Sequence, residues 1–190
     1  MAGNADNKSY LNPGVFSAEQ LLKKFGHRTA IVRLVRENRL ISLGAGYYAT
    51  PNLDPFVAQI HVVARFYPKA VISGISALVI HGLCDERLDK VTVDIPKGTR
   101  VRNNLIDAKR VALSRLIGVT RMAYFGKQIK IYNIERTLCD AYRVDRGELF
   151  FKALKSYVEK YKPDPEKIAA YDKALGTRVL SSLQQELAVG

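Results

Sequence analysis

The chain has 190 residues, which is enough for one domain or two small ones, and its 47% hydrophobic content supports a buried core. Lys and Arg total 30 against 18 Asp and Glu, and this net charge of +12 indicates a polyanionic partner; the alternative is a charge that serves solubility alone. No apolar run reaches the length of a membrane span and no signal-peptide pattern opens the chain, so we expect a cytoplasmic protein with no membrane contact.

The most regular pattern near the start of the chain, over residues 16–51, predicts a helix, a tight turn, a second helix and a two-stranded hairpin. Ser17 and Gln20 have the spacing of a capping box at the start of the first helix. Gly26 ends that helix, and the second is predicted over 28–38. Short strands then flank a glycine-rich turn. This order is the layout of a winged helix-turn-helix.

In that layout the second helix enters the DNA major groove, about 12 Å wide, and its outer face contacts the DNA. Arginine binds phosphate oxygens and guanine edges through paired hydrogen bonds. A glycine wing lets the backbone approach a phosphate closely. The predicted DNA-binding residues are Arg28, Thr29, Val32, Arg33 and Arg36 on the helix, and Gly44 and Gly46 in the wing. The alternative, a merely solvated helix face, is disfavoured by the capped helix before it and the Gly-x-Gly turn after it.

A proline-rich junction follows the wing and predicts a domain boundary. Asp54 suits an N-cap and Pro55 the first position of a helix. We therefore predict a winged helix-turn-helix DNA-binding domain over 1–52 and a second domain over 53–190. A winged helix usually has a further helix before the one that Ser17 starts. Since little chain precedes Ser17, we expect that helix to be very short or absent.

The second domain is predicted to be mixed α/β with a helical C-terminus, which makes the whole chain α+β. Helices and strands alternate up to a hairpin near Gly126, and helices follow from Asn133 onward. Ser73 is expected to cap an apolar core helix. Cys84 and Cys139 form no C-x-x-C motif, so both are expected to be reduced and buried.

The segment 97–130 has nine basic residues and one acid, Asp107, which predicts a basic surface outside the helix-turn-helix. Three interpretations stay open: a solvated sheet face, a contact to the DNA backbone, or a docking face for an acidic protein or RNA. The nine residues are Lys97, Arg100, Arg102, Lys109, Arg110, Arg115, Arg121, Lys127 and Lys130.

Several short segments, taken in their order along the chain, resemble one protein family. They are Arg39–Pro51 around the wing, Ser73–Leu83, Val91–Pro96 and Ile134–Asp140. Together these look like the AbiEi-type antitoxins, which are winged-helix transcriptional regulators of bacterial toxin–antitoxin and abortive-infection modules. The resemblance covers the chain from about residue 15 to residue 161.

This resemblance implies a function for each half of the chain. The N-terminal domain would bind double-stranded operator DNA and repress its own operon. The C-terminal domain would counteract a nucleotidyltransferase-like toxin encoded alongside, with direct contact between the two left open. The chain has Ala45 at the wing tip, where the family often has a basic residue, and Asn133 where it often has serine. The alternative is a non-enzymatic protein- or RNA-binding module that uses the basic 97–130 surface.

The second domain also resembles a nucleotidyltransferase fold that has lost its catalytic acids. In that pattern, a turn like Ser73-Gly74 precedes a strand with two acids one residue apart, which hold two magnesium ions. Here Asp94 is followed by Ile95 and Pro96, so proline replaces the second acid. We therefore expect no enzyme activity, no catalytic residue, no metal and no cofactor. Asp94 is expected to accept hydrogen bonds from a nearby turn or to pair with a base.

Overall fold

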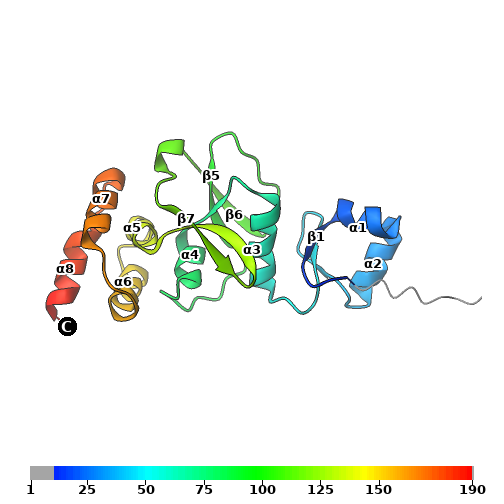
Figure 1. Cartoon of the computed structure of the whole chain (residues 1–190), viewed down its shortest axis with the longest axis horizontal. Coiled ribbons are helices and arrows are strands. Elements are labelled where there is room, and N and C mark those ends of the chain that lie inside the picture. The colour runs from blue at the N-terminus through cyan, green and yellow to red at the C-terminus, as the bar shows by residue number, and fades with distance from the viewer. Residues whose placement is uncertain (1–10, 190) are drawn as a thin grey trace, which may run out of the picture.

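The computed structural model describes residues 11–189, which form an α+β protein with one three-stranded and one five-stranded sheet. The molecule is elongated: α1 and α2 lie at one end, the larger sheet in the middle, and α7 and α8 at the other end (Figure 1). Among the described helices, none combines the length and apolar character that crossing a bilayer requires. The leading helix, predicted to be very short or absent, concerns residues that lie mostly outside the described range.

The N-terminal unit, defined here as residues 11–52, contains two helices and a small antiparallel sheet. Its elements are β1 (Val15–Ser17), α1 (Ala18–Phe25), α2 (Arg28–Arg36), β2 (Ile41–Ser42) and β3 (Tyr47–Ala49). The capping box is confirmed: Gln20 N donates to Ser17 Oγ at 3.3 Å and Ser17 N donates to Gln20 Oε1 at 3.1 Å. The strand β1 was not predicted. It pairs with β3, which gives the sheet order β1-β3-β2.

The larger sheet has the strand order β6-β5-β4-β8-β7 and is mixed in direction. The β4–β8 and β5–β6 pairs are parallel, whereas β4–β5 and β7–β8 are antiparallel. Its elements with their helices are α3 (Pro55–Phe66), β4 (Val71–Ile72), α4 (Gly74–Ile80), β5 (Val91–Pro96), β6 (Ile106–Val111), the 3-10 turn η1 (Leu113–Arg115), β7 (Val119–Tyr124) and β8 (Lys127–Tyr132). The predicted Asp54 cap and the hairpin near Gly126 are confirmed.

Alternation along β5 assigns its side chains to opposite faces of the sheet. Val91, Val93 and Ile95 are buried in a cluster with α3. Thr92 and Asp94 therefore face the opposite side, where α4 and the C-terminal helices lie (Figure 1). This arrangement places Asp94 on the face toward the helices that follow the sheet.

Four helices complete the chain: α5 (Ile134–Val144), α6 (Glu148–Lys160), α7 (Pro165–Leu175) and α8 (Val179–Val189). They share one core with α4, centred on side chains such as Leu138, Phe150 and Leu154. Asn133 caps α5, as its sequence position predicts.

The Gly176-Thr177 pair lies between α7 and α8 and by its residue types predicts a local cap for α8, but the structure has a different one. Both oxygens of Asp172, on α7, accept hydrogen bonds from the first turn of α8, at 3.0 Å from Val179 N and 2.8 Å from Leu180 N. Thr177 instead donates its hydroxyl to Asp172. A carboxylate replaces the expected local cap because it satisfies two backbone donors at once.

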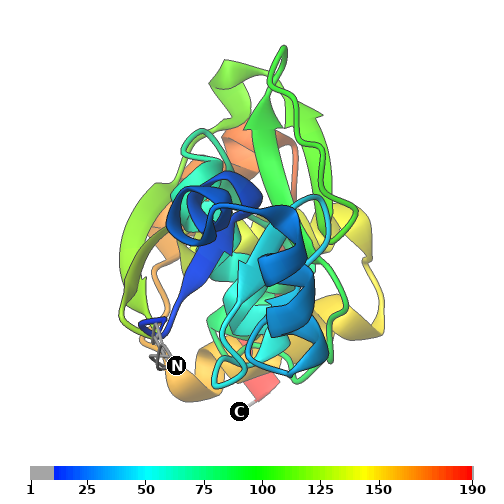
Figure 2. The same ribbon diagram turned by 90° about the vertical axis from the view of Figure 1, so that its right-hand side faces the viewer.

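The N-terminal unit packs directly against α3. Val15 and Ala49 share a buried cluster with Ala58 and Val62 of that helix. In addition, Arg65 Nη1 donates to the carbonyl oxygen of Val15 at 2.6 Å. Figure 2 looks onto this end of the molecule, with the two short helices nearest the viewer. The boundary predicted at residue 52 stays a prediction, and a cut there would remove some of the apolar partners of Ala58 and Val62, among them Val15 and Ala49.

Candidate nucleic-acid interface

All five residues predicted on the outer face of α2 are exposed. Ile31 and Leu34, on the inner face, are only 2% and 6% exposed, so the helix is buried along one side alone. Val32, between the arginines of the outer face, is 55% exposed. The helix thus presents a continuous face on which three arginines surround one apolar side chain.

Two of these side chains already have partners on the helix. Arg33 Nε donates to Glu37 Oε1 at 2.6 Å, and this pair raises the pKa of Arg33 and lowers that of Glu37. Thr29 Oγ1 lies 2.7 Å from Nδ1 of His27, which also accepts from Ala30 N and caps the helix. Since Arg33 is 79% exposed at its side chain, water screens its pair with Glu37 and a phosphate can compete for it.

The two wing glycines make different contacts within the protein, and their predicted contact with DNA stays a prediction. Residues 44–46 all have positive φ, which suits glycine and is uncommon for Ala45. A side chain at Gly44 would come within 2.7 Å of Asn104 Oδ1, in the loop between β5 and β6. Gly46 O accepts from Ala18 N at 2.6 Å, which ties the wing to α1. The lack of a side chain at Gly44 therefore lets the wing pack closely against the second domain. Ala45 and Gly46 are exposed.

The nine bases predicted as one surface fall in three separate places, because β6 and β7 form opposite edges of the sheet. Arg100 and Arg102 are exposed in the loop whose Asn104 touches the wing. Four others line a cavity beside β6: Lys97, Lys109, Arg110 and Arg115. The remaining three, Arg121, Lys127 and Lys130, belong to the β7–β8 hairpin.

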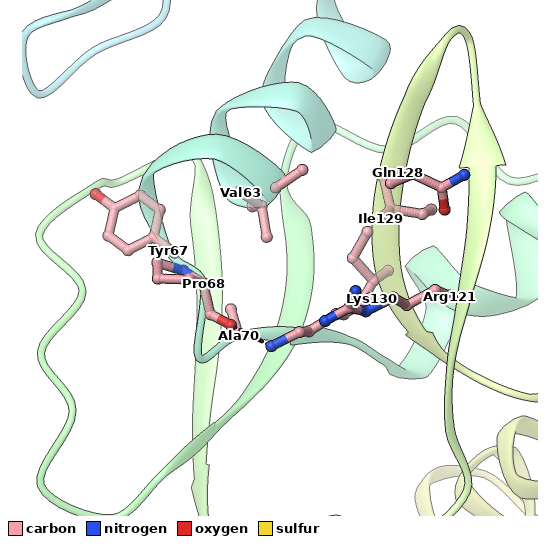
Figure 3. Close-up of a pocket in the computed structure, with 10 residues that line it drawn as sticks. Val63, Tyr67, Pro68, Ala70, Arg121, Gln128, Ile129 and Lys130 are labelled. Carbon is pink, nitrogen blue, oxygen red and sulfur yellow. Dashed lines mark hydrogen bonds between the residues drawn. The ribbon is translucent and has the colours of Figure 1, made fainter.

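Lys130 makes a structural contact beside a small cavity next to this hairpin (Figure 3). Its Nζ donates to the carbonyl oxygen of Pro68 at 2.7 Å, which joins β8 to the turn after α3. Arg121 lines the same cavity, of about 240 Å³, together with apolar side chains such as Val63 and Ile129. Lys130 is therefore less available to an anion than its charge suggests.

Asp94 is held by two hydroxyl groups on the face of the sheet toward α5. Ser73 Oγ donates to one carboxylate oxygen and Tyr132 Oη to the other, each at 3.0 Å. The predicted hydrogen bond from a nearby turn is thus confirmed. The expected cap is not, because the Ser73 hydroxyl donates to Asp94 and makes no side-chain hydrogen bond to the start of α4. Burial, followed by the charge of Asp140, raises the pKa of Asp94 above its ordinary value.

We predict that Asp94→Asn leaves stability at neutral pH unchanged or higher. Because the pKa of Asp94 is raised, the folded protein binds this proton more tightly than the unfolded chain does. The protonated carboxyl group therefore stabilises the fold at low pH, and this stabilisation is lost as pH rises through the folded pKa. The amide has no charge to desolvate. The free energy of unfolding, measured in urea between about pH 4 and pH 7, should therefore fall with pH more steeply for wild type than for the variant. Parallel pH profiles would contradict this.

Two further side chains of a type that can serve in catalysis, His81 and Cys139, have different partners. His81 Nε2 is 2.8 Å from the carbonyl oxygen of Tyr132, and burial lowers the pKa of its imidazole. Cys139 donates to Asp172, and burial raises the pKa of its thiol to about 12. Cys84 and Cys139 are both free and buried, as predicted. Within residues 11–189, no three His, Cys, Asp or Glu side chains gather as a metal site.

Sequence reasoning missed the charged group formed by Arg136, Asp140 and Arg143 on α5. Arg136 is 1% exposed; its Nη1 lies against Asp140 Oδ1, and its guanidinium carbon is 4.3 Å from the centre of the Tyr132 ring. Arg143 Nη1 lies 3.5 Å from the same Asp140 oxygen. The spacing of Arg136 and Asp140, four residues apart, was the available sequence signal.

Comparison with known proteins gives a fold likeness and no family assignment. No family model and no curated protein matches the chain. Among solved structures, the chain is similar to the RV2827C protein from Mycobacterium tuberculosis, with a TM-score of 0.62 and 17% sequence identity. The match covers 92% of this chain and 72% of that one. At this identity the likeness concerns the fold alone.

Proposed function

We propose that this protein is a DNA-binding transcriptional regulator whose N-terminal unit is a winged helix-turn-helix. The observation that carries the proposal is the exposed face of α2, with Arg28, Arg33 and Arg36 around Val32. The order strand, helix, helix, strand, strand supports this assignment, as does pairing of β1 with the wing. Arginines at this spacing suit guanine edges and phosphates, and Val32 suits the methyl group of thymine.

The wing and its neighbouring loop extend the proposed contact. Gly44 rests on Asn104, so the wing and the β5–β6 loop lie together. That loop carries exposed Arg100 and Arg102. We assign these two arginines to the DNA backbone beside the wing, since phosphate contacts position a protein without reading sequence. Lys130 is not assigned to DNA, because its ammonium group donates a hydrogen bond to the carbonyl oxygen of Pro68.

The proposal includes a second role, as the antitoxin that counteracts a nucleotidyltransferase-like toxin and represses the operon that encodes both. The sequence resemblance to AbiEi-type antitoxins supports this role. The Asp94 environment agrees with a domain that does not transfer nucleotides, because the carboxylate is engaged by Ser73 and Tyr132. A second carboxylate is also missing one residue after Ile95, where Pro96 stands.

A mobility-shift titration with the full chain tests the DNA-binding proposal. Duplex from the region upstream of its own gene should bind more tightly than random duplex of equal length, and both affinities should fall as salt rises. Equal affinity for the two duplexes at every salt concentration would contradict sequence-specific DNA binding.

Antitoxin activity should separate from DNA binding. We predict that a full-length variant with Arg28, Arg33 and Arg36 all replaced by alanine still protects cells from the neighbouring toxin, because these exposed side chains support no buried contact. Growth with the toxin induced is the measurement, and loss of DNA binding by the same variant is its control. A full-length variant is preferable to the fragment 53–190, since that cut uncovers Ala58 and Val62. Loss of protection would tie antitoxicity to DNA binding.

The second candidate function, a protein- or RNA-binding module that uses the 97–130 bases, has less support. Its nine bases are divided between opposite edges of the sheet and the loop beside the wing. A single partner would have to span three separate regions. Binding of single-stranded RNA that survives the α2 triple variant unchanged, without binding of duplex DNA, would favour this candidate.

A further inference from the structure

A cavity of about 240 Å³ lies between the end of β5, the edge strand β6, the turn η1 and helix α5. It is far from α2, and none of its lining residues belongs to the N-terminal unit. Cationic side chains predominate in its lining and come from four different elements. The lining cations are Lys97, Lys109, Arg110, Arg115, Arg136 and Arg143, against the single carboxylate of Asp94.

The charges around this cavity do not balance. Arg110 is opposite Ile95 in the β5–β6 register, so its side chain is on the α3 face of the sheet. Asp140 pairs with both Arg136 and Arg143, so the other five lining cations face two carboxylates and an excess of three positive charges remains. Lys109 is directly opposite Asp94 in the β5–β6 register, so these two side chains lie on the same side of the cavity. Burial raises the pKa of Asp94, and its protonation would enlarge the excess further.

Arg136 adds a buried positive charge to the wall of this cavity. It is 1% exposed, and among the described residues its Nε has no hydrogen-bond partner. Its Nη2 makes one long bond, 3.4 Å, to the carbonyl oxygen of Arg115. A buried guanidinium normally satisfies its donors, because an unpaired charged donor costs free energy in a medium of low polarity. Nε itself is fully buried, so an anion in the cavity would balance the charge of this guanidinium through its field and not through contact with Nε.

We propose that this cavity binds the phosphate chain of a small polyphosphate compound. A phosphate monoester carries about two negative charges, so a single phosphate would leave part of the excess unbalanced, whereas a chain of phosphates would balance it. Arginine and lysine are the side chains that bind phosphate oxygens most strongly. The cavity is smaller than the roughly 300–1,000 Å³ of typical ligand pockets, so the phosphates enter and any attached nucleoside stays at the mouth. A duplex backbone does not fit, because Arg136 lies below the surface.

Isothermal titration of the full chain at constant ionic strength tests this site, with tripolyphosphate, ATP and inorganic phosphate as separate probes. Tripolyphosphate should bind one molecule per chain. Lys109→Gln combined with Arg115→Gln should weaken that binding by roughly tenfold or more, since each removed cation takes charge-assisted hydrogen bonds with it. The matched control, Arg121→Gln with Lys127→Gln, removes the same charge from the opposite edge of the sheet and should weaken it less than about threefold.

The probes also distinguish the source of the phosphate chain. Equal affinity for tripolyphosphate and ATP would identify the chain alone as the recognised group, and tighter ATP would add a nucleoside at the mouth; both support the site. Three results would overturn it: no saturable binding of either compound, equal loss in the two double variants, or inorganic phosphate binding as tightly as tripolyphosphate. Binding of single-stranded RNA without binding of tripolyphosphate or ATP would likewise contradict the proposal. Circular dichroism checks that each variant is folded.

Discussion

Arg33→Ala should weaken binding of the upstream duplex by roughly 5- to 150-fold, the range for losing one arginine contact to a base. Arg33 stands at the centre of the exposed α2 face and is free of burial, so the substitution should leave the fold unchanged. Its existing partner, Glu37, competes with DNA for the guanidinium but cannot hold it strongly in water. The loss should be measured by fluorescence anisotropy at several salt concentrations.

The matched control is Arg178→Ala, an exposed arginine next to α8 at the opposite end of the molecule. It removes the same charge at a distance from α2, so its effect on affinity should be small and should vanish at high salt. If Arg33 contacts a phosphate alone, the loss will be equal for upstream and random duplexes. Equal losses for Arg33→Ala and Arg178→Ala would show that α2 is not the contacting helix.

Asp140→Ala should have the largest effect on stability, a loss of about 3–5 kcal/mol in the free energy of unfolding. The carboxylate pairs with Arg136, which is 1% exposed, and with Arg143. Removing it leaves a buried guanidinium without its counter-charge, and this costs far more than the interaction itself contributes. Urea denaturation at pH 7 measures the difference.

Glu37→Ala is the control for that loss, because it also breaks an arginine–carboxylate pair spaced four residues apart on a helix. The pair it breaks, with Arg33, is exposed to water. Its unfolding curve should therefore stay close to that of the wild type. An unfolding midpoint for Asp140→Ala as close to wild type as that of Glu37→Ala would mean that α5 rearranges to let water reach Arg136.

Much of the secondary structure could be predicted because its signals are local. The Ser17–Gln20 box, the Asp54 cap with Pro55, and the Asn133 cap each join residues within a turn of one another. Apolar spacing likewise predicted which face of α2 would be buried, since a helix fixes the orientation of each side chain. The exposed arginine face of the proposed interface follows directly from these local rules.

The candidate sites away from α2 depend on contacts that local patterns do not encode. Ser73 could cap α4 or bond Asp94, and the choice rests on a residue 21 positions away. The same holds for Gly44, whose position against Asn104 requires the second domain.

By itself, the sequence determined the α+β class, the capped helices and the outward-facing arginines of α2, because spacing of a few residues suffices for each. The tertiary structure alone decided the sheet order, which separates the 97–130 bases by placing β6 and β7 at opposite edges. It also decided that Arg136 is buried over Tyr132 beside a cavity lined by cations from four elements. Strand pairing and burial depend on groups far apart in the chain, and their free energies are set only when the whole fold has formed.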